Sequence, residues 1–149
     1  MKKRSERNHN ARYLNKRRHE RQNRARRRRL ANIALYEETL RTICETFPEC
    51  FSLGALRAPL KIDIRHDLIR ALPDIPEKQI CGALAIYTDD LLAYRANFLL
   101  RAIRRDLQGK PCGEVSIEAA EHAGLALLDA GLYEPAAEIA RSVAARLAA

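Results

Sequence analysis

The chain has 149 residues, 47% of them hydrophobic, which is enough for one domain with its own core but hardly for two. Its formal net charge of +8 is unevenly spread, because residues 1–30 carry 14 Lys and Arg against two Glu, whereas residues 31–149 have a net charge of −4. No apolar run approaches the roughly 20 residues of a membrane span, and no apolar signal core follows the basic N-terminus, so we expect neither a membrane protein nor a secreted one, but a cytoplasmic protein. The charge asymmetry predicts a nucleic-acid-binding arm on a folded module.

The sulfur-containing and ionisable side chains form no pattern typical of a metal site or a catalytic centre. The cysteines include no CxxC pair, so we expect reduced, mostly buried thiols and no metal. No Ser/His/Asp or Cys/His constellation and no phosphate-binding glycine loop is legible. We therefore expect a protein that is not an enzyme and has no cofactor and no small-molecule substrate. The four cysteines are Cys44, Cys50, Cys81 and Cys112.

Residues 1–29, the basic arm, are dense in charge and poor in apolar residues. Such a segment alone is predicted to be disordered by self-repulsion, or partly helical once phosphates neutralise it. Apolar residues at helical spacing predict a helix from about Asn23 to Phe47, which Pro48 ends. The run RRHERQNRARRRRL at 17–30 concentrates the charge in eight arginines: Arg17, Arg18, Arg21, Arg24, Arg26, Arg27, Arg28 and Arg29.

The middle of the chain predicts further helices separated by proline breaks. Leucines and isoleucines spaced by four predict a helix over residues 59–72, although the alternation of Ile62 and Ile64 leaves a short strand open. Pro76 fits the first turn of a helix that runs to the tyrosine at 87. Thr88 is a candidate N-cap for a following helix through Phe98.

The last third predicts a β-hairpin and two helices. Two short extended runs in IRRDLQGKPCGEVSI, residues 103–117, flank glycines and a proline, as in a hairpin. Ser116 is a candidate N-cap for the next helix, Gly131 breaks it, and Pro135 starts a last Ala-rich helix. The predicted fold class is mainly α with a small β-hairpin, with boundaries after residues 29 and 126 and a helical extension over 127–149.

Several blocks stand out along the chain: FPECF at 47–51, RAPLKIDIRHDL at 57–68, GALAIYT at 82–88, RRDLQGKPCGEV at 104–115 and EHA at 121–123. These blocks resemble those of the ProQ/FinO domain, a bacterial RNA-binding family. The resemblance covers roughly residues 35–125 and implies a mostly helical fold with a small hairpin. It also implies an RNA chaperone or small-RNA partner, or a plasmid regulator of an antisense RNA, that binds a terminator-like hairpin and its single-stranded 3′ tail.

The same resemblance assigns candidate RNA contacts. Lys61, Arg57 and Arg104 match basic residues of the family's RNA-binding face, and Tyr87, Thr88 and, if one residue is inserted after Thr88, the downstream aromatic Tyr94 match residues beside its pocket for the RNA 3′ end. The alternative for the cations is solvated surface charge, and for Tyr87 a place in the core. Four further cations are candidates on proximity alone: Arg65, Arg101, Arg105 and Lys110.

Departures from the family pattern predict a folded domain that binds RNA more weakly than its relatives. Asp89 and Asp90 follow the Tyr-Thr pair, and Gln108 replaces the family's second Asp in the hairpin block. We therefore expect a division of labour, in which the basic arm attracts and anneals RNA while the domain positions it. The alternatives are a protein-interaction module whose arm binds RNA or ribosomes nonspecifically, and DNA binding by the arm. No membrane partner is expected, and a monomer is favoured.

Overall fold

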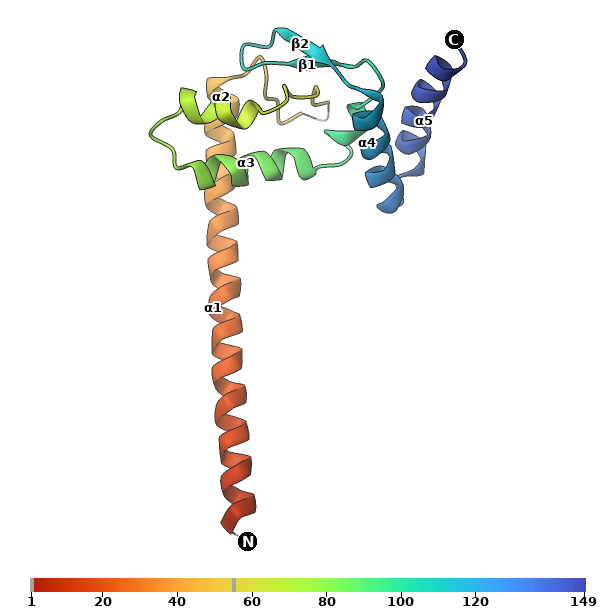
Figure 1. The fold of residues 1–149 in the computed structure, drawn as a ribbon. Coiled ribbons are helices and arrows are strands. Elements are labelled where there is room, and N and C mark those ends of the chain that lie inside the picture. Colours follow the sequence, from red (N-terminus) through yellow and green to blue (C-terminus); the bar gives the residue numbers. More distant parts are fainter. Residues whose placement is uncertain (1, 55) are drawn as a thin grey trace. The chain divides into compact units, whose positions relative to one another are not determined.

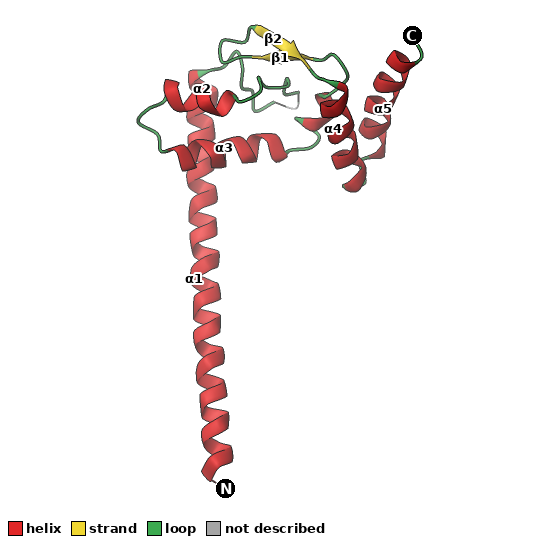
Figure 2. Cartoon of the chain, in the orientation of Figure 1, coloured by secondary structure: helices red, strands yellow, loops and turns green. Residues whose placement is uncertain are grey.

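The computed structural model describes residues 2–54 and 56–149, and the chain divides into two compact units, Met1–Leu35 and Tyr36–Ala149. Residue 1, which belongs to the predicted arm, and residue 55, which follows the predicted helix end at Pro48, lie outside the described residues. Helices and one small antiparallel hairpin make up the fold, which confirms the predicted fold class (Figures 1 and 2). In chain order the elements are α1 (Lys2–Thr46), α2 (Ile64–Ala71), α3 (Glu77–Asp89), η1 (Arg95–Asn97), β1 (Ile103–Arg105), β2 (Pro111–Glu114), α4 (Ile117–Asp129) and α5 (Tyr133–Leu147).

The first unit is helical throughout its described residues. Helix α1 begins at Lys2, so the predicted start near Asn23 is wrong. The reason is compositional, because Arg, Lys, Gln, Glu and Ala are good helix formers and residues 2–46 contain neither Gly nor Pro. Side chains at 10–31 are exposed, because this charge-dense stretch has few apolar residues to bury. Among the described residues no helix has the length and apolar composition of a membrane span.

One hydrophobic cluster forms the core of the second unit. The last turns of α1 contribute Leu40 and Ile43, and α5 contributes Ile139 and Val143, so the C-terminal helix shares the core of the unit. Gly82 lets α3 approach Tyr36 closely, since a Cβ there would lie 2.5 Å from the tyrosine ring. The predicted domain boundaries at residues 29 and 126 stay predictions.

The segment before α2 is extended, which corrects the helix predicted over residues 59–72. Leu60 forms a parallel bridge with Arg105, in which Lys61 donates its N–H to the Arg105 carbonyl oxygen at 2.9 Å. Arg105 in turn donates its N–H to the Pro59 carbonyl oxygen at 2.9 Å. These bonds to a distant strand satisfy the backbone groups that a helix would otherwise pair, so α2 begins only at Ile64.

Thr88 lies inside α3, so its prediction as an N-cap is wrong. Its Oγ1 donates to the Leu84 carbonyl oxygen at 3.0 Å, as Thr does inside a helix. The next turn is capped instead by Asp90, whose Oδ1 accepts from the Ala93 N–H at 3.1 Å. Only the short η1 follows, so the helix predicted through Phe98 is mostly a turn.

The hairpin and the start of α4 confirm the predictions for the last third. Asp106 Oδ1 accepts from the N–H groups of Gln108 and Lys110, both at 2.9 Å, and so fixes the turn between β1 and β2. Ser116 Oγ accepts from the Ala119 N–H at 3.1 Å, which is the predicted cap of α4. Gly131, with φ of 76°, follows α4 in the left-handed conformation typical of a helix end.

Candidate nucleic-acid interface

Two of the predicted RNA contacts, Tyr87 and Tyr94, lie in a ladder of four aromatic rings inside the second unit. Successive ring centroids from Phe51 to Tyr87, Tyr94 and Phe98 are 5.1, 5.9 and 5.0 Å apart. Tyr87 is 0% exposed and Tyr94 5%, and burial raises the pKa of both hydroxyls. The structure therefore places both tyrosines in the core, where each packs against the next ring.

The hydroxyl groups of these tyrosines hold the chain around the ladder. Tyr87 Oη accepts from the Ser52 N–H at 3.3 Å, and Tyr94 Oη accepts from the Leu60 N–H at 3.2 Å. Leu60 directly precedes Lys61, so the position of that lysine depends on the tyrosine beneath it. The tyrosines thus support the chain beneath a candidate contact, and their own contact with RNA stays a prediction.

Arg57 is tied to the end of α3. Its Nη1 donates to the Tyr87 carbonyl oxygen at 2.7 Å, and its guanidinium carbon lies 4.5 Å from the Tyr87 ring centroid. Asp90 Oδ2 lies 3.8 Å from Arg57 Nη2, so one of the two carboxylates that depart from the family pattern is paired within the chain. The Arg57 side chain is only 10% exposed, which leaves little of it for a phosphate.

Arg104 has a similar internal role on the hairpin. Its Nη1 donates to the Leu60 carbonyl oxygen at 2.7 Å, and its guanidinium carbon lies 5.4 Å from the Phe98 ring centroid. The Nε atoms of Arg57 and Arg104 are both buried without a hydrogen bond among the described residues. Both arginines therefore brace the ladder and the extended segment before α2.

Lys61 belongs to a three-residue charge cluster on the surface. Asp67 on α2 accepts from Lys61 Nζ at 2.7 Å and from Arg70 Nη2 at 2.6 Å. The hydrogen bond from Lys61 is the main cause that lowers the Asp67 pKa, and the same bond raises the pKa of Lys61. The lysine and Arg70 side chains remain 41% and 76% exposed, so both cations can still meet a ligand.

The charge cluster lines a surface hollow of about 400 Å³, which we call the Lys61 hollow. The turn of the hairpin forms its other side through Asp106 and Gln108. Arg70 was missed by sequence reasoning, although its position three residues after Asp67 on a predicted helix was a usable signal. The structure thus brings α2 and the hairpin together around one lysine and one arginine.

The remaining candidate cations differ in solvent exposure and in their hydrogen bonds within the chain. Arg65, Arg101 and Lys110 are exposed, whereas Arg105 is half-buried and donates from Nη1 to the Gly109 carbonyl oxygen at 3.3 Å. Arg95 is a cation that sequence reasoning missed, with its guanidinium carbon 5.3 Å from the Phe98 ring centroid. Exposed cations therefore lie on α2 and on or beside the hairpin, in addition to the half-buried Arg57 and Arg104.

The eight arginines of the run at 17–30, from Arg17 to Arg29, are all exposed. None of them forms an ion pair with a described side chain. One contact within the arm places the Arg17 guanidinium carbon 5.4 Å from the Tyr13 ring centroid. Guanidinium groups so exposed can bind phosphates bidentately and stack on bases.

Comparisons with known proteins agree with this architecture. The sequence model of the ProQ/FINO family matches residues 34–133. The RNA chaperone ProQ of Aliivibrio fischeri (strain MJ11) is 39% identical over 94 residues, which cover 61% of this chain and 45% of that protein. The RNA chaperone ProQ of Pasteurella multocida (strain Pm70) is 39% identical over 97 residues, which cover 63% and 46%.

The chain spans about half the length of these curated relatives. The solution NMR structure of a ProQ homolog from Legionella pneumophila matches with a TM-score of 0.55 and 23% sequence identity. That match covers 68% of this chain and 84% of the homolog, and it shows a shared fold.

Proposed function

Because the chain belongs to the ProQ/FinO family, we propose that it binds structured RNA and acts as an RNA chaperone in the cytoplasm. The observation that carries the proposal is the Lys61 hollow, where exposed Lys61 and Arg70 lie between α2 and the hairpin turn. RNA affinity comes largely from cations that contact phosphates, and helical RNA is recognised by its shape and backbone. The protein binds its RNA and has no catalytic role.

The ligand we propose is a terminator-like hairpin with a single-stranded 3′ tail, in a small or antisense RNA that regulates gene expression. The folded unit positions this RNA through the Lys61 hollow and the exposed cations Arg65, Arg101 and Lys110. The arm supplies a second, less selective attraction, because its arginines from Arg17 to Arg29 are exposed and form no ion pair with a described side chain. This division of labour makes the total affinity depend strongly on salt.

One observation favours the alternative of a protein-interaction module with a nonspecific arm. Two candidate RNA contacts of the folded unit, Arg57 and Arg104, donate to backbone carbonyl oxygens, and Lys61 already pairs with Asp67. On that view only the arm holds RNA or ribosomes. The two functions differ in one respect, since only an RNA-positioning domain prefers a tailed hairpin.

Fluorescence anisotropy with a labelled terminator-like hairpin, with and without its tail, tests the proposal at two salt concentrations. The double variant Lys61→Ala/Arg70→Ala should lose the preference for the tail, whereas the matched control Lys78→Ala, exposed on α3, should keep it. Arg26→Ala/Arg29→Ala should weaken binding to every RNA alike and make the affinity depend less steeply on salt concentration. The alternative would be established if wild type bound the hairpins with and without the tail equally well, and if the double variant bound them as the Lys78→Ala control does.

A further inference from the structure

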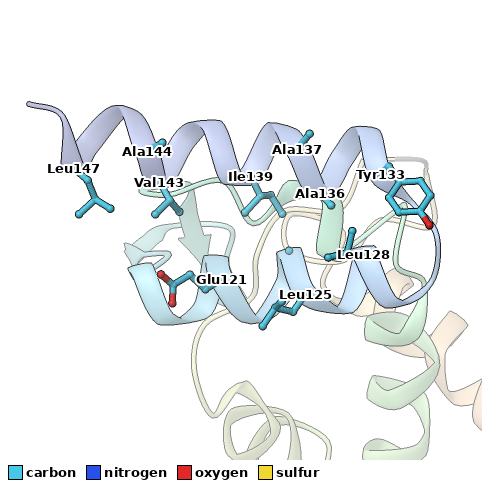
Figure 3. Close-up of a pocket in the computed structure, with 12 residues that line it drawn as sticks. Glu121, Leu125, Leu128, Tyr133, Ala136, Ala137, Ile139, Val143, Ala144 and Leu147 are labelled. Atoms are coloured by element: carbon cyan, nitrogen blue, oxygen red, sulfur yellow. The ribbon is translucent and has the colours of Figure 1, made fainter.

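An open apolar groove runs between α4 and α5 and belongs to no part of the RNA interface (Figure 3). Its volume is about 700 Å³, and eleven of its twelve lining residues are apolar, Tyr or Gly. Leu125, Leu128, Tyr133 and Leu147 line it and are 46–75% exposed. Figure 3 shows Val143 and Leu147 of α5 directed towards α4 across the groove. Several large apolar side chains gathered on one exposed surface mark an interaction site rather than ordinary surface.

The surroundings of the groove are acidic. Glu121 is its one lining residue charged at neutral pH, and in an adjoining hollow that shares Tyr133 with it two acids, Glu134 and Glu138, outnumber one base, Arg141. Residues 111–149 contain six acids against two Arg, a net charge of −4. A helix that fits this surface must therefore combine large apolar side chains with positive charge.

The chain itself carries such a helix face. Arg26, Arg29, Leu30 and Ile33 follow the spacing i, i+3, i+4, i+7, which places them on one side of α1. Leu30 is 68% exposed and Ile33 48%, and both arginines are exposed. No Asp or Glu occurs between residues 20 and 37, so nothing on this stretch opposes an acidic partner.

We propose that the α4–α5 groove binds the Arg26–Ile33 face of α1 from a second copy of this chain. Leu30 and Ile33 enter the apolar groove, and the two arginines approach Glu121 and the glutamates beside Tyr133. The contact joins unlike surfaces, so one copy supplies the helix and the other supplies the groove. It is weakened by salt, because exposed charges on both sides are screened.

Sedimentation equilibrium of the full chain without RNA, over a range of protein concentrations and at low and high salt, tests this contact. The wild type should show a concentration-dependent mass above that of a monomer at low salt and a smaller one at high salt. Leu125→Glu in the groove and Leu30→Glu on α1 should each weaken association about tenfold or more, because each places a charge in an apolar contact. The matched controls are Leu53→Glu in the second unit and Leu14→Glu on the arm, and both should associate as the wild type does. In the wild type, Leu53 is 53% exposed and Leu14 is 64% exposed.

Mixing the two variants makes the test specific. Leu125→Glu keeps an intact α1 face and Leu30→Glu keeps an intact groove, so an equimolar mixture should restore association that neither variant shows alone. A wild type that stays monomeric at every concentration, variants that associate as the controls do, or a mixture that remains monomeric would each overturn the proposal. RNA binding measured in parallel should be unchanged in Leu125→Glu, so failure of this contact and failure of the proposed function are separate results.

Discussion

The guanidinium of Arg57 donates to the carbonyl oxygen of Tyr87 at 2.7 Å while it lies over the ring of the same residue at 4.5 Å. One side chain thus caps the last turns of α3 and covers the aromatic ladder. Asp90, just beyond α3, lies 3.8 Å from the same guanidinium. These contacts give Arg57 a role in stabilising the fold, although its charge suggests that it contacts RNA.

We expect Arg57→Ala to destabilise the folded unit by about 1–3 kcal/mol, because a charged hydrogen bond to a carbonyl is lost and the Tyr87 ring is uncovered. Arg57→Lys should recover only part of this, since an ammonium group cannot reproduce the planar contact with the ring. Urea unfolding followed by circular dichroism measures both changes. The control Arg65→Ala removes an exposed arginine and should stay within about 0.5 kcal/mol of wild type. Equal stability of the two alanine variants would contradict the structural role.

Gly82→Ala should destabilise the chain although alanine is the better helix former. The new methyl group would lie 2.5 Å from the Tyr36 ring, and such overpacking costs about 1–3 kcal/mol. The comparison is Gly124→Ala in α4, where the nearest atom is on Ile139 at 3.4 Å. Helix propensity alone should make that variant as stable as wild type or more so. Thermal unfolding measures both variants, and opposite signs are the expected result.

Asp67 should make stability depend on pH in the acid range. Its pKa in the folded chain is lowered below the ordinary 3.8, chiefly by the hydrogen bond from Lys61. The carboxylate therefore adds stability that is fully present above its unfolded pKa and is lost as the pH falls through the folded pKa. Urea unfolding at neutral pH and near pH 3 should show a smaller loss for Asp67→Asn than for wild type. The control Asp74→Asn changes an exposed acid and should lose stability as wild type does.

Cys112 and Cys50 should react with thiol reagents in two distinct phases. Burial raises the pKa of Cys50 to about 12, whereas Cys112 on β2 is exposed. Because the thiolate is the reactive form, Cys112 should react in the folded protein and Cys50 only after unfolding. Stopped-flow labelling with Ellman's reagent at pH 8 measures the phases, and Cys112→Ser should remove the fastest one. A fast phase that survives this substitution would contradict the assignment.

Local signals explain which parts of the fold could be predicted. The hairpin, the Ser116 cap and the break at Gly131 depend on residues within a few positions of each other, and all three are confirmed. Thr88 failed as a cap because the same hydroxyl also bonds a carbonyl inside a helix, and the sequence does not choose between these uses. Residues 59–61 failed as a helix because the hydrogen-bond partner of Pro59 and Lys61, Arg105, is far along the chain.

In the candidate site, too, the contacts that could not be predicted join residues far apart in the sequence. Arg57 and Arg104 donate to carbonyl oxygens 30 and 44 residues away, and no side-chain pattern reveals a backbone acceptor. Their charge is visible in the sequence, but its use within the fold is not. Arg70 had a local signal, the i, i+3 spacing from Asp67, because that ion pair lies on one helix.

The aromatic ladder also gives the second unit its own optical reporter. The chain contains no Trp, and two of its five tyrosines, Tyr87 and Tyr94, are buried with ring centroids 5.9 Å apart. Near-ultraviolet circular dichroism arises from aromatic rings held rigidly, so the ladder should dominate this spectrum. Tyr94 bonds the backbone next to Lys61, and therefore the packing beneath the proposed RNA contact can be compared between wild type and the Lys61 and Arg70 variants in unlabelled protein without RNA.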